Sequence, residues 1–553
     1  MKSSDRLFAY HVDLKRAMWR LDYLAGFVRR LKRWGFNAVV LEMEDKFRFS
    51  RHPAIVHSDA PTHEEWRTWA RDCRRQGVDV IPLVQTLGHL EFALNRPEYA
   101  HLREAPGLVH HVDVTNPAAR PFVLDLVREA LEVFEPERFL HVGGDETWEL
   151  AKSKRLKPWL NRRGELYLRH LLPVFAEVRR QGLRPMLWHD MVVSHPEILP
   201  RIPKDVVMVH WDYTIAALRE KRIRVWGGRR PGSRERGNVA VRWGAEYRRG
   251  VTPEFRQFLE PFAVDAQTRK DGTFAAFYCT DAMKARGLEV ITASANRCAG
   301  DQIGMPMFSR HVPNCYWSAW KGLREASGNL VTSWAVRHNH PETDLPATLA
   351  AVLAARGRPG DTVETSLAAW TESVFGAALP GFAEAARLAE QGVLPLGRAG
   401  QWRDRLDGLQ QRGEDRLSQD VKDLVQSLGG PVKTRAFLAR LRRGYTAART
   451  CFRSARRRAR RNRNLLDFWF EGVELQDFYA EFLQAALARD LPRRARNLHR
   501  RLQQLVAGTR ALFSLTYTPR SVEDEILWRY GYHLEYLGRL LAERGLAPDR
   551  RRR

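Results

Sequence analysis

Between residue 7 and about residue 335, short apolar runs alternate along the chain with longer amphipathic segments. Such alternation is typical of parallel strands that are covered by helices. The predicted strands span residues 7–13, 37–44, 79–85, 138–143, 184–190, 205–211, 288–295 and 329–334. Eight strands of this kind close a TIM barrel, so the pattern predicts an α/β protein built on a (β/α)8 barrel.

The segments between these runs have the spacing of amphipathic helices. Leu21, Leu24, Phe27 and Val28 fall on one helical face, and the sequence Thr62-His-Glu-Glu is typical of a helix N-terminus. We therefore assign residues 1–358 to the barrel domain. The stretch around residues 223–275, between the sixth and seventh strands, mixes turn residues with charge and is predicted to be an insertion.

After about residue 360 the strand pattern stops and helical patterns take over. Ile526, Tyr530, Leu534, Leu537 and Leu541 share one helical face, and Ser521-Val-Glu-Asp is expected to cap that helix. We predict that residues 359–553 form an arginine-rich, all-α C-terminal domain.

The composition is that of a globular protein of more than one domain. The 553 residues exceed the usual size of a single core, and 44% of them are apolar. The chain holds 91 Lys and Arg against 65 Asp and Glu, a net charge of +26. Most of this excess is spread out, with runs at residues 453–463 and 550–553. We expect a solvated helix face and a frayed tail there, and do not expect a nucleic-acid partner.

The cysteines and the apolar runs point to a cytoplasmic protein. The five cysteines show no disulfide or metal-finger spacing, and we interpret Cys298 and Cys315 as ordinary buried thiols. The N-terminus lacks a signal-like apolar region, and no run of apolar residues is long enough to cross a membrane.

In a TIM barrel, the carboxyl ends of the strands meet at the active-site face. The predicted strand ends bring together His11, Asp13, Glu42, Glu44, Asp45, Gln85, His89, Glu91, His141, Asp145, Glu146, Trp188, His189, Asp190, Trp211, Asp212, Tyr213, Asn296 and Trp334. Carboxylates, imidazoles and tryptophans are therefore expected to converge on one mouth.

Three chemistries are compatible with this mouth. His11, Asp13, His141, His189 and Asp190 are metal-ligand types, although no local spacing defines a metal site. Glycoside hydrolysis by two opposed carboxylates needs a separation that neighbouring residues do not easily provide.

In substrate-assisted hydrolysis the 2-acetamido oxygen of the sugar attacks C1, so the protein supplies one acid and one carboxylate that orients the amide. The adjacent Asp145 and Glu146 suit that task. Gly143 and Gly144 are expected to let the backbone turn sharply, so that both carboxyl groups reach the mouth.

The run His141-Val-Gly-Gly-Asp-Glu-Thr-Trp resembles the hallmark of glycoside hydrolase family 20, the β-N-acetylhexosaminidases. Further matches lie at residues 12–16, 37–45 and 80–89. The sequence Val84-Gln-Thr-Leu-Gly-His-Leu-Glu-Phe looks most like the hexosaminidase D branch of that family. The resemblance covers about residues 5–340.

The resemblance implies that Glu146 is the general acid/base and that Asp145 orients the acetamido group. It also implies substrate-binding or supporting roles for Arg16, His89, His141, Trp188, Asp190, Trp211, Asp212, Tyr213 and Trp334. Arg16 would grip sugar hydroxyls, and the phenol of Tyr213 would bind the acetamido oxygen. Glu42 stands where the family usually has His, and Gln85 where it usually has an acidic residue.

These expectations amount to a retaining exo-β-N-acetylhexosaminidase that removes terminal GlcNAc or GalNAc from a glycan or glycoconjugate, with no metal and no cofactor. Two alternatives stay open. One is a catalytically degenerate barrel that binds carbohydrate or a polyanion, and the other is a metal-dependent TIM-barrel hydrolase. The helical domain either packs on the barrel or builds a homo-oligomer.

Overall fold

The structure is a computed structural model that describes residues 6–229, 236–336, 338–392, 400–413 and 415–545. The arginine run at residues 550–553, for which we expected a frayed tail, lies outside the described residues.

Eight parallel strands close into the predicted barrel. They are β1 (Leu7–Asp13), β2 (Ala38–Glu42), β3 (Asp79–Leu83), β4 (Phe139–His141), β5 (Arg184–Trp188), β6 (Val207–Trp211), β11 (Glu289–Arg297) and β12 (Gly328–Ser333). Closure occurs between the first and last strands, where Ala9 pairs with Leu330 on one side and with Ala38 on the other. The (β/α)8 fold class is therefore confirmed, and each predicted strand is one of the barrel strands.

Several strands end earlier than the sequence pattern predicts. The second and third end at Glu42 and Leu83 rather than at Glu44 and Gln85. The polar residues beyond each end leave the hydrogen-bonded sheet and enter the loops at the mouth, which is where side chains for chemistry are needed.

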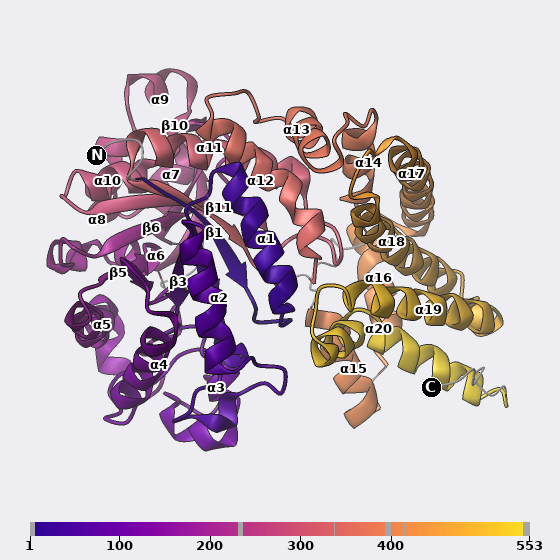
Figure 1. Cartoon of the computed structure of the whole chain (residues 1–553), viewed down its shortest axis with the longest axis horizontal. Helices are drawn as coiled ribbons and strands as arrows, with labels where there is room; N and C mark the ends of the chain where they lie inside the picture. The colour runs from indigo at the N-terminus through magenta and orange to yellow at the C-terminus, as the bar shows by residue number, and fades with distance from the viewer. Residues whose placement is uncertain (1–5, 230–235, 337, 393–399, 414, 546–553) are drawn as a thin grey trace.

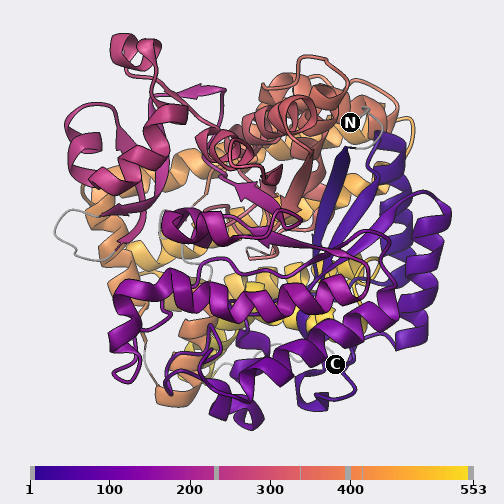
Figure 2. The ribbon, with the colours of Figure 1, turned by 90° about the vertical axis from the view of Figure 1, so that its left-hand side faces the viewer.

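Helices cover the outside of the barrel (Figures 1 and 2). They are α1 (Leu21–Trp34), α2 (His63–Arg75), α3 (Glu91–Leu94), α4 (Ala119–Phe134), α5 (Arg163–Arg180), α6 (Asp190–Ser194), α10 (Tyr278–Lys284), α11 (Phe308–Glu325) and α12 (Pro341–Ala355). On α1, Leu24, Phe27 and Val28 are buried, as the spacing predicts. Thr62 and Glu65 form both hydrogen bonds of the expected capping box at the start of α2.

The segment between β6 and β11 is a folded insertion. It contains β7 (Arg219–Glu220), β8 (Arg222–Arg229), β9 (Arg236–Arg242), α7 (Ala245–Gly250), α8 (Pro253–Ala263), α9 (Ala266–Asp271) and β10 (Phe274–Ala275). β8 and β9 form an antiparallel hairpin, and β7 pairs with β10. The elaborated loop expected around residues 223–275 thus has regular structure of its own.

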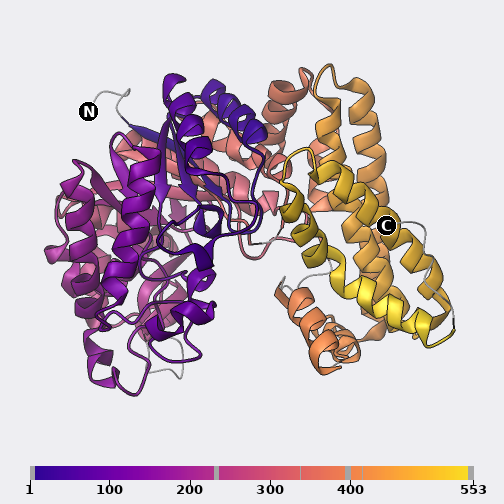
Figure 3. The same cartoon turned by 60° about the horizontal axis from the view of Figure 1, so that its bottom comes forward.

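After α12 the described chain is entirely helical and lies to one side of the barrel (Figures 1 and 3). The helices are α13 (Val363–Phe375), α14 (Phe382–Ala389), α15 (Gly400–Arg412), α16 (Leu417–Ser427), α17 (Pro431–Arg458), α18 (Leu466–Leu487), α19 (Leu491–Phe513) and α20 (Pro519–Ala542). On α20, Ile526, Tyr530, Leu537 and Leu541 are buried, as the pattern predicts.

The predicted cap of α20 is wrong. The helix begins at Pro519, and its N-cap residue, Thr518, lies three residues before the predicted cap Ser521. Ser521 therefore lies inside the first turn, and its Oγ accepts a hydrogen bond from the backbone N–H of Met18 in the barrel, at 2.9 Å. A tertiary partner has taken the hydroxyl that the local pattern assigned to the helix end.

The arginine run at residues 453–463 spans the end of α17 and the turn after it, and most of its side chains are exposed. Arg461 donates to the carbonyl oxygens of Ser373 and Val374 at the C-terminal end of α13, where positive charge is favourable. Among the described helices, we find none with the length and apolar character needed to cross a bilayer.

Candidate active site

A pocket of about 740 Å³ opens among the loops that follow the barrel strands, and Asp145 and Glu146 line it. Both residues follow β4 directly, so the sequence motif and the barrel mouth coincide. The size is suitable for one or two sugar rings.

The turn after β4 depends on its two glycines. Gly143 and Gly144 have φ angles of 67° and 87°, in the left-handed region that favours glycine. A Cβ atom at Gly143 would lie 2.1 Å from Oε1 of Gln85, and one at Gly144 would lie 2.8 Å from a methyl group of Leu187. The sharp departure from the strand expected for this pair is therefore confirmed, and larger residues do not fit.

Glu146 itself has a left-handed backbone, with φ of 51°, which is strained for a residue with a side chain. Its backbone N–H donates to Oδ2 of Asp190 at 2.9 Å, while the indole Nε1 of Trp211 donates to Oδ1 at 3.4 Å. Asp190 is fully buried and does not line the pocket. The Asp190 carboxyl group thus holds both the turn of residues 143–146, here called the acidic turn, and Trp211 of the pocket wall.

His89 lies beside both pocket carboxyl groups and favours the ionised form of Asp145. Its Nε2 lies 3.2 Å from Oδ2 of Asp145 and 3.8 Å from Oε2 of Glu146. Burial lowers the pKa of His89, but the charge of Asp145, its hydrogen bond to His89 and the charge of Glu146 together raise that pKa to about 10. Burial opposes ionisation of Asp145, yet the charge of His89 holds the pKa of that carboxyl below its usual value.

The neighbouring Glu146 responds in the opposite direction. Burial, and next the negative charge of Asp145, raises the pKa of Glu146. Two adjacent carboxyl groups with pKa values driven apart are the arrangement that assigns an acid and an ionised partner. Asp145 is the ionised member of the pair, and Glu146 is the member that keeps a proton more readily.

Aromatic rings form the wall beside these carboxyl groups. Trp211 stacks on Tyr213 with ring centroids 5.1 Å apart, and Trp334 Nε1 donates to the Tyr213 hydroxyl at 2.8 Å. The Tyr213 hydroxyl thus accepts a hydrogen bond from Trp334 and lies at the pocket surface. Trp188 is fully buried behind this wall, 5.8 Å from Trp334 between ring centroids.

Of the residues predicted to bind substrate, the structure brings about half to the pocket surface. Arg16, His89, Trp211, Tyr213 and Trp334 line it. The other four, His141, Trp188, Asp190 and Asp212, lie behind the surface.

Two of these four have clear structural partners. The imidazole Nδ1 of His141 accepts from the backbone N–H of Gly143 at 3.0 Å, so it supports the acidic turn. Asp212 accepts from the backbone N–H of Thr214 at 2.9 Å and so anchors the loop after β6.

A cluster of charged residues lies beside β1 and β2, and its Lys15, which lines the pocket, was not among the residues predicted at the mouth. Lys15 lies 3.5 Å from Asp13 and Glu42 and 3.6 Å from Glu44, and its Nζ lies 5.1 Å from the ring centroid of Trp334. Burial raises the pKa of Glu44 to about 8; the positive charge of Lys15 lowers this pKa, and the negative charge of Glu42 raises it further. The signal that could have found Lys15 was its position two residues after the first predicted strand.

Arg224, Arg310 and Cys298 line the pocket from segments without a recognisable motif. Arg224 comes from the insertion hairpin, and Arg310, from α11, donates to the carbonyl oxygen of Tyr213 at 3.2 Å. The interpretation of Cys298 as an ordinary buried thiol is wrong, since it is partly exposed at the pocket, whereas Cys315 is buried. Burial raises the pKa of the Cys298 thiol to about 11, so it is protonated near neutrality.

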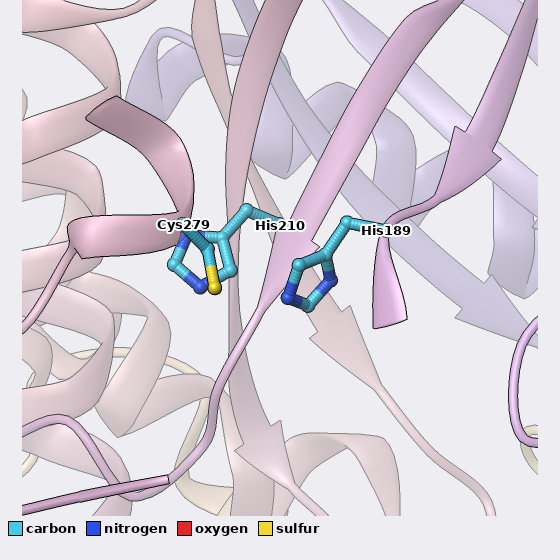
Figure 4. A group of neighbouring side chains, drawn as sticks. All are labelled: His189, His210 and Cys279. Carbon is cyan, nitrogen blue, oxygen red and sulfur yellow. The ribbon is translucent and has the colours of Figure 1, made fainter. Parts of the chain in front are cut away.

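Two groups of metal-ligand side chains occur within the described residues. His189, His210 and Cys279 lie buried together behind the pocket wall (Figure 4), and His89, Glu91 and His110 lie at the pocket. In the first group, Nδ1 of His189 lies 3.4 Å from the backbone nitrogen of Trp211, and Nδ1 of His210 lies 2.7 Å from the hydroxyl of Thr280. Of the residues suggested for a metal by sequence, only His189 enters either group.

Residues 47–224 match the profile of the glycosyl hydrolase family 20 catalytic domain. Hexosaminidase D from Bos taurus is 30% identical over 215 residues, which cover 37% of this chain and 62% of that protein. Hexosaminidase D from Homo sapiens is 30% identical over 214 residues, which cover 37% of this chain and 44% of that protein. The chain thus spans less than two thirds of the length of these relatives.

A solved structure, the β-N-acetylhexosaminidase from Bacteroides fragilis NCTC 9343, aligns with 63% of this chain and 65% of its own at 13% identity, with a TM-score of 0.42. The profile match covers β4 and the acidic turn after it, and the hexosaminidase D relatives agree with the branch suggested by the residues around His89. Residues 47–224, which include the acidic turn, are therefore similar to the catalytic domain of glycosyl hydrolase family 20.

Proposed function

We propose that the barrel is a retaining exo-β-N-acetylhexosaminidase that hydrolyses terminal GlcNAc or GalNAc by substrate-assisted catalysis. The observation that carries the proposal is the charge division at the acidic turn, where His89 keeps Asp145 ionised beside Glu146, whose pKa is raised. The family match and the hexosaminidase D relatives support the same reaction class.

In the first step, the acetamido oxygen of the bound sugar attacks C1, and the bond from C1 to the leaving oxygen breaks. Glu146 donates its proton to that leaving oxygen. The Asp145 carboxylate accepts the acetamido N–H, which orients the internal nucleophile and balances the positive charge of the oxazolinium intermediate. The Tyr213 hydroxyl donates a hydrogen bond to the acetamido oxygen and so positions that oxygen for attack on C1.

In the second step, Glu146 is a carboxylate and accepts a proton from a water molecule as that water attacks C1. The bond between C1 and the acetamido oxygen breaks, and the sugar leaves with its original anomeric configuration. Glu146 is protonated again and the cycle closes. Each group thus acts at a different atom of the substrate.

The test is turnover of the aryl β-glycosides of GlcNAc, GalNAc and glucose in the presence of EDTA, with Glu146→Gln as the variant. We expect hydrolysis of the acetamido sugars only, and a loss of kcat of roughly 10²- to 10⁴-fold in the variant, because general acid–base catalysis contributes about that much. Rapid cleavage of the glucoside would contradict the internal nucleophile. Loss of activity with EDTA would favour the metal-dependent hydrolase, and binding without turnover would favour the degenerate binder.

A further inference from the structure

The segment that joins α19 to α20 pairs with the barrel loop that follows β1. The backbone N–H of Arg20 donates to the carbonyl oxygen of Thr516 at 2.8 Å, and that of Thr518 donates to the carbonyl oxygen of Met18 at 3.0 Å. Trp19 and Tyr517 form the antiparallel bridge between these bonds. The loop after β1 therefore gains a neighbouring strand-like segment from the far end of the chain, and this loop carries Arg16.

The same helix holds a second loop of the mouth, the one that follows β12. Glu525 on α20 lies 2.9 Å from Nδ1 of His338, and the buried Arg529 donates to the carbonyl oxygen of His338. Trp334 and Val336, earlier in this loop, line the pocket. Two walls of the pocket thus rest on one helix of the C-terminal region.

Trp528 lies where these two loops meet. Its ring centroid is 4.6 Å from the guanidinium carbon of Arg16, and it stacks on the ring of His338 at 4.8 Å. Arg16 lines the pocket, and its buried Nε has no hydrogen-bond partner within the described residues. A guanidinium over an indole face is held electrostatically and by dispersion, so the ring restricts the direction of Arg16.

We propose that α20 supports two walls of the sugar-binding pocket, and that Trp528 is a positioning residue that holds Arg16 toward the bound sugar. This inference rests on the proposed function, because it takes the sugar as the ligand of Arg16. Trp528 is not among the residues that line the pocket, so it acts through Arg16 rather than on the reacting atoms. The C-terminal region then contributes to substrate affinity and leaves the chemical step to the acidic turn.

The test compares Trp528→Leu with Trp528→Phe, which keeps an aromatic face. We expect Trp528→Leu to raise KM roughly 5- to 30-fold, the range of a cation–π contact at a partly desolvated site, with kcat within about 2-fold of the wild type. Trp528→Phe restores part of the affinity. Trp320→Leu is the matched control, because it removes a ring that lies 5.1 Å from Arg324 outside the pocket, and its KM stays at the wild-type value.

A double-mutant cycle with Arg16→Met separates positioning from general loss of structure. In the Arg16→Met background, Trp528→Leu is expected to change KM by less than about 2-fold, because the side chain it positions is gone. Thermal melts of each variant exclude unfolding. An additive effect of the two substitutions on KM would overturn the proposal even if Trp528→Leu alone is impaired.

Labelling of Arg16 by phenylglyoxal, followed by peptide mass spectrometry, tests the same contact without turnover. We expect Arg16 to react several-fold faster in Trp528→Leu than in the wild type or in Trp320→Leu. If the wild type is active and the folded Trp528→Leu variant keeps the wild-type KM and the wild-type labelling rate, this inference is refuted and the proposed function stands. A wild type inactive on every acetamido sugar would refute the proposed function, and the labelling rate would then decide whether Trp528 positions Arg16.

Discussion

The charge of His89 is the feature of the pocket whose removal has the largest calculable effect. We choose His89→Asn, since the backbone of His89 is left-handed, with φ of 55°, and Asn tolerates that conformation best among residues with a side chain. The substitution removes the positive charge that lies 3.2 Å from Asp145.

The size of the effect follows from Coulomb's law. At 3.2 Å and an effective dielectric constant of about 20, two unit charges interact by about 5 kcal/mol, or about 4 pKa units. The side chain of His89 is 24% exposed, and water screens part of this energy. We therefore expect the pKa of Asp145 to rise by about 2 to 3 units in the variant.

The sign of the pH effect follows from which form of Asp145 is active. The carboxylate is required, so activity falls as pH drops through its pKa. In the wild type His89 holds that pKa below its usual value, and the acid limb of kcat/KM lies below about pH 4. In His89→Asn, the charge that opposes the effect of burial is gone, so the acid limb moves to higher pH.

The assay is the pH dependence of kcat/KM on an aryl β-glycoside of GlcNAc. His110→Asn is the control, because His110 is another partly buried imidazole at the mouth that contacts the His89 ring but pairs with Glu91, at 2.8 Å, rather than with Asp145. Its acid limb should move by less than about 0.5 unit. Coincident acid limbs for wild type and a folded His89→Asn variant would refute the electrostatic account of the acidic turn.

Two further substitutions test the framework around the site. Gly143→Ala should lower the free energy of unfolding by about 3 kcal/mol or more, because its methyl group meets Gln85 and its φ is left-handed. The control Gly182→Ala, which has a similar φ but open space around it, should lower that free energy by only about 1 kcal/mol. Equal urea midpoints for the two variants would contradict this reasoning. Arg529→Met should cost about 3 to 5 kcal/mol in urea unfolding, because it leaves Glu471 unpaired, and a loss under about 1 kcal/mol would show that this ion pair is not needed.

Much of the barrel and the acidic turn could be predicted from sequence because their signals are local. Each barrel strand is a short apolar run, and its burial on both faces makes the run nearly continuous, so all of them could be recognised without knowledge of the fold. Asp145 and Glu146 follow a strand and two glycines within a few residues. Their placement at the mouth follows from the barrel rule alone.

The division of the predicted site into lining and supporting residues required coordinates. Asp190 and Trp211 are both the last residues of predicted strands, yet Asp190 is a buried support and Trp211 lines the pocket. Which side chain faces the cavity depends on where each strand ends within the closed barrel. An error of two residues in a strand boundary therefore changes the predicted surface of the site.

The contribution of the C-terminal region was decided entirely by tertiary structure. The pattern of α20 predicted its apolar face, but Ser521 bonds to Met18 instead of capping the helix, and Trp528 lies on Arg16, more than 500 residues away in the chain. Local spacing determines whether a segment is a strand or a helix, because the relevant contacts lie within a few residues. Which surfaces meet depends on packing over the whole chain, and a single sequence carries no local signal for it.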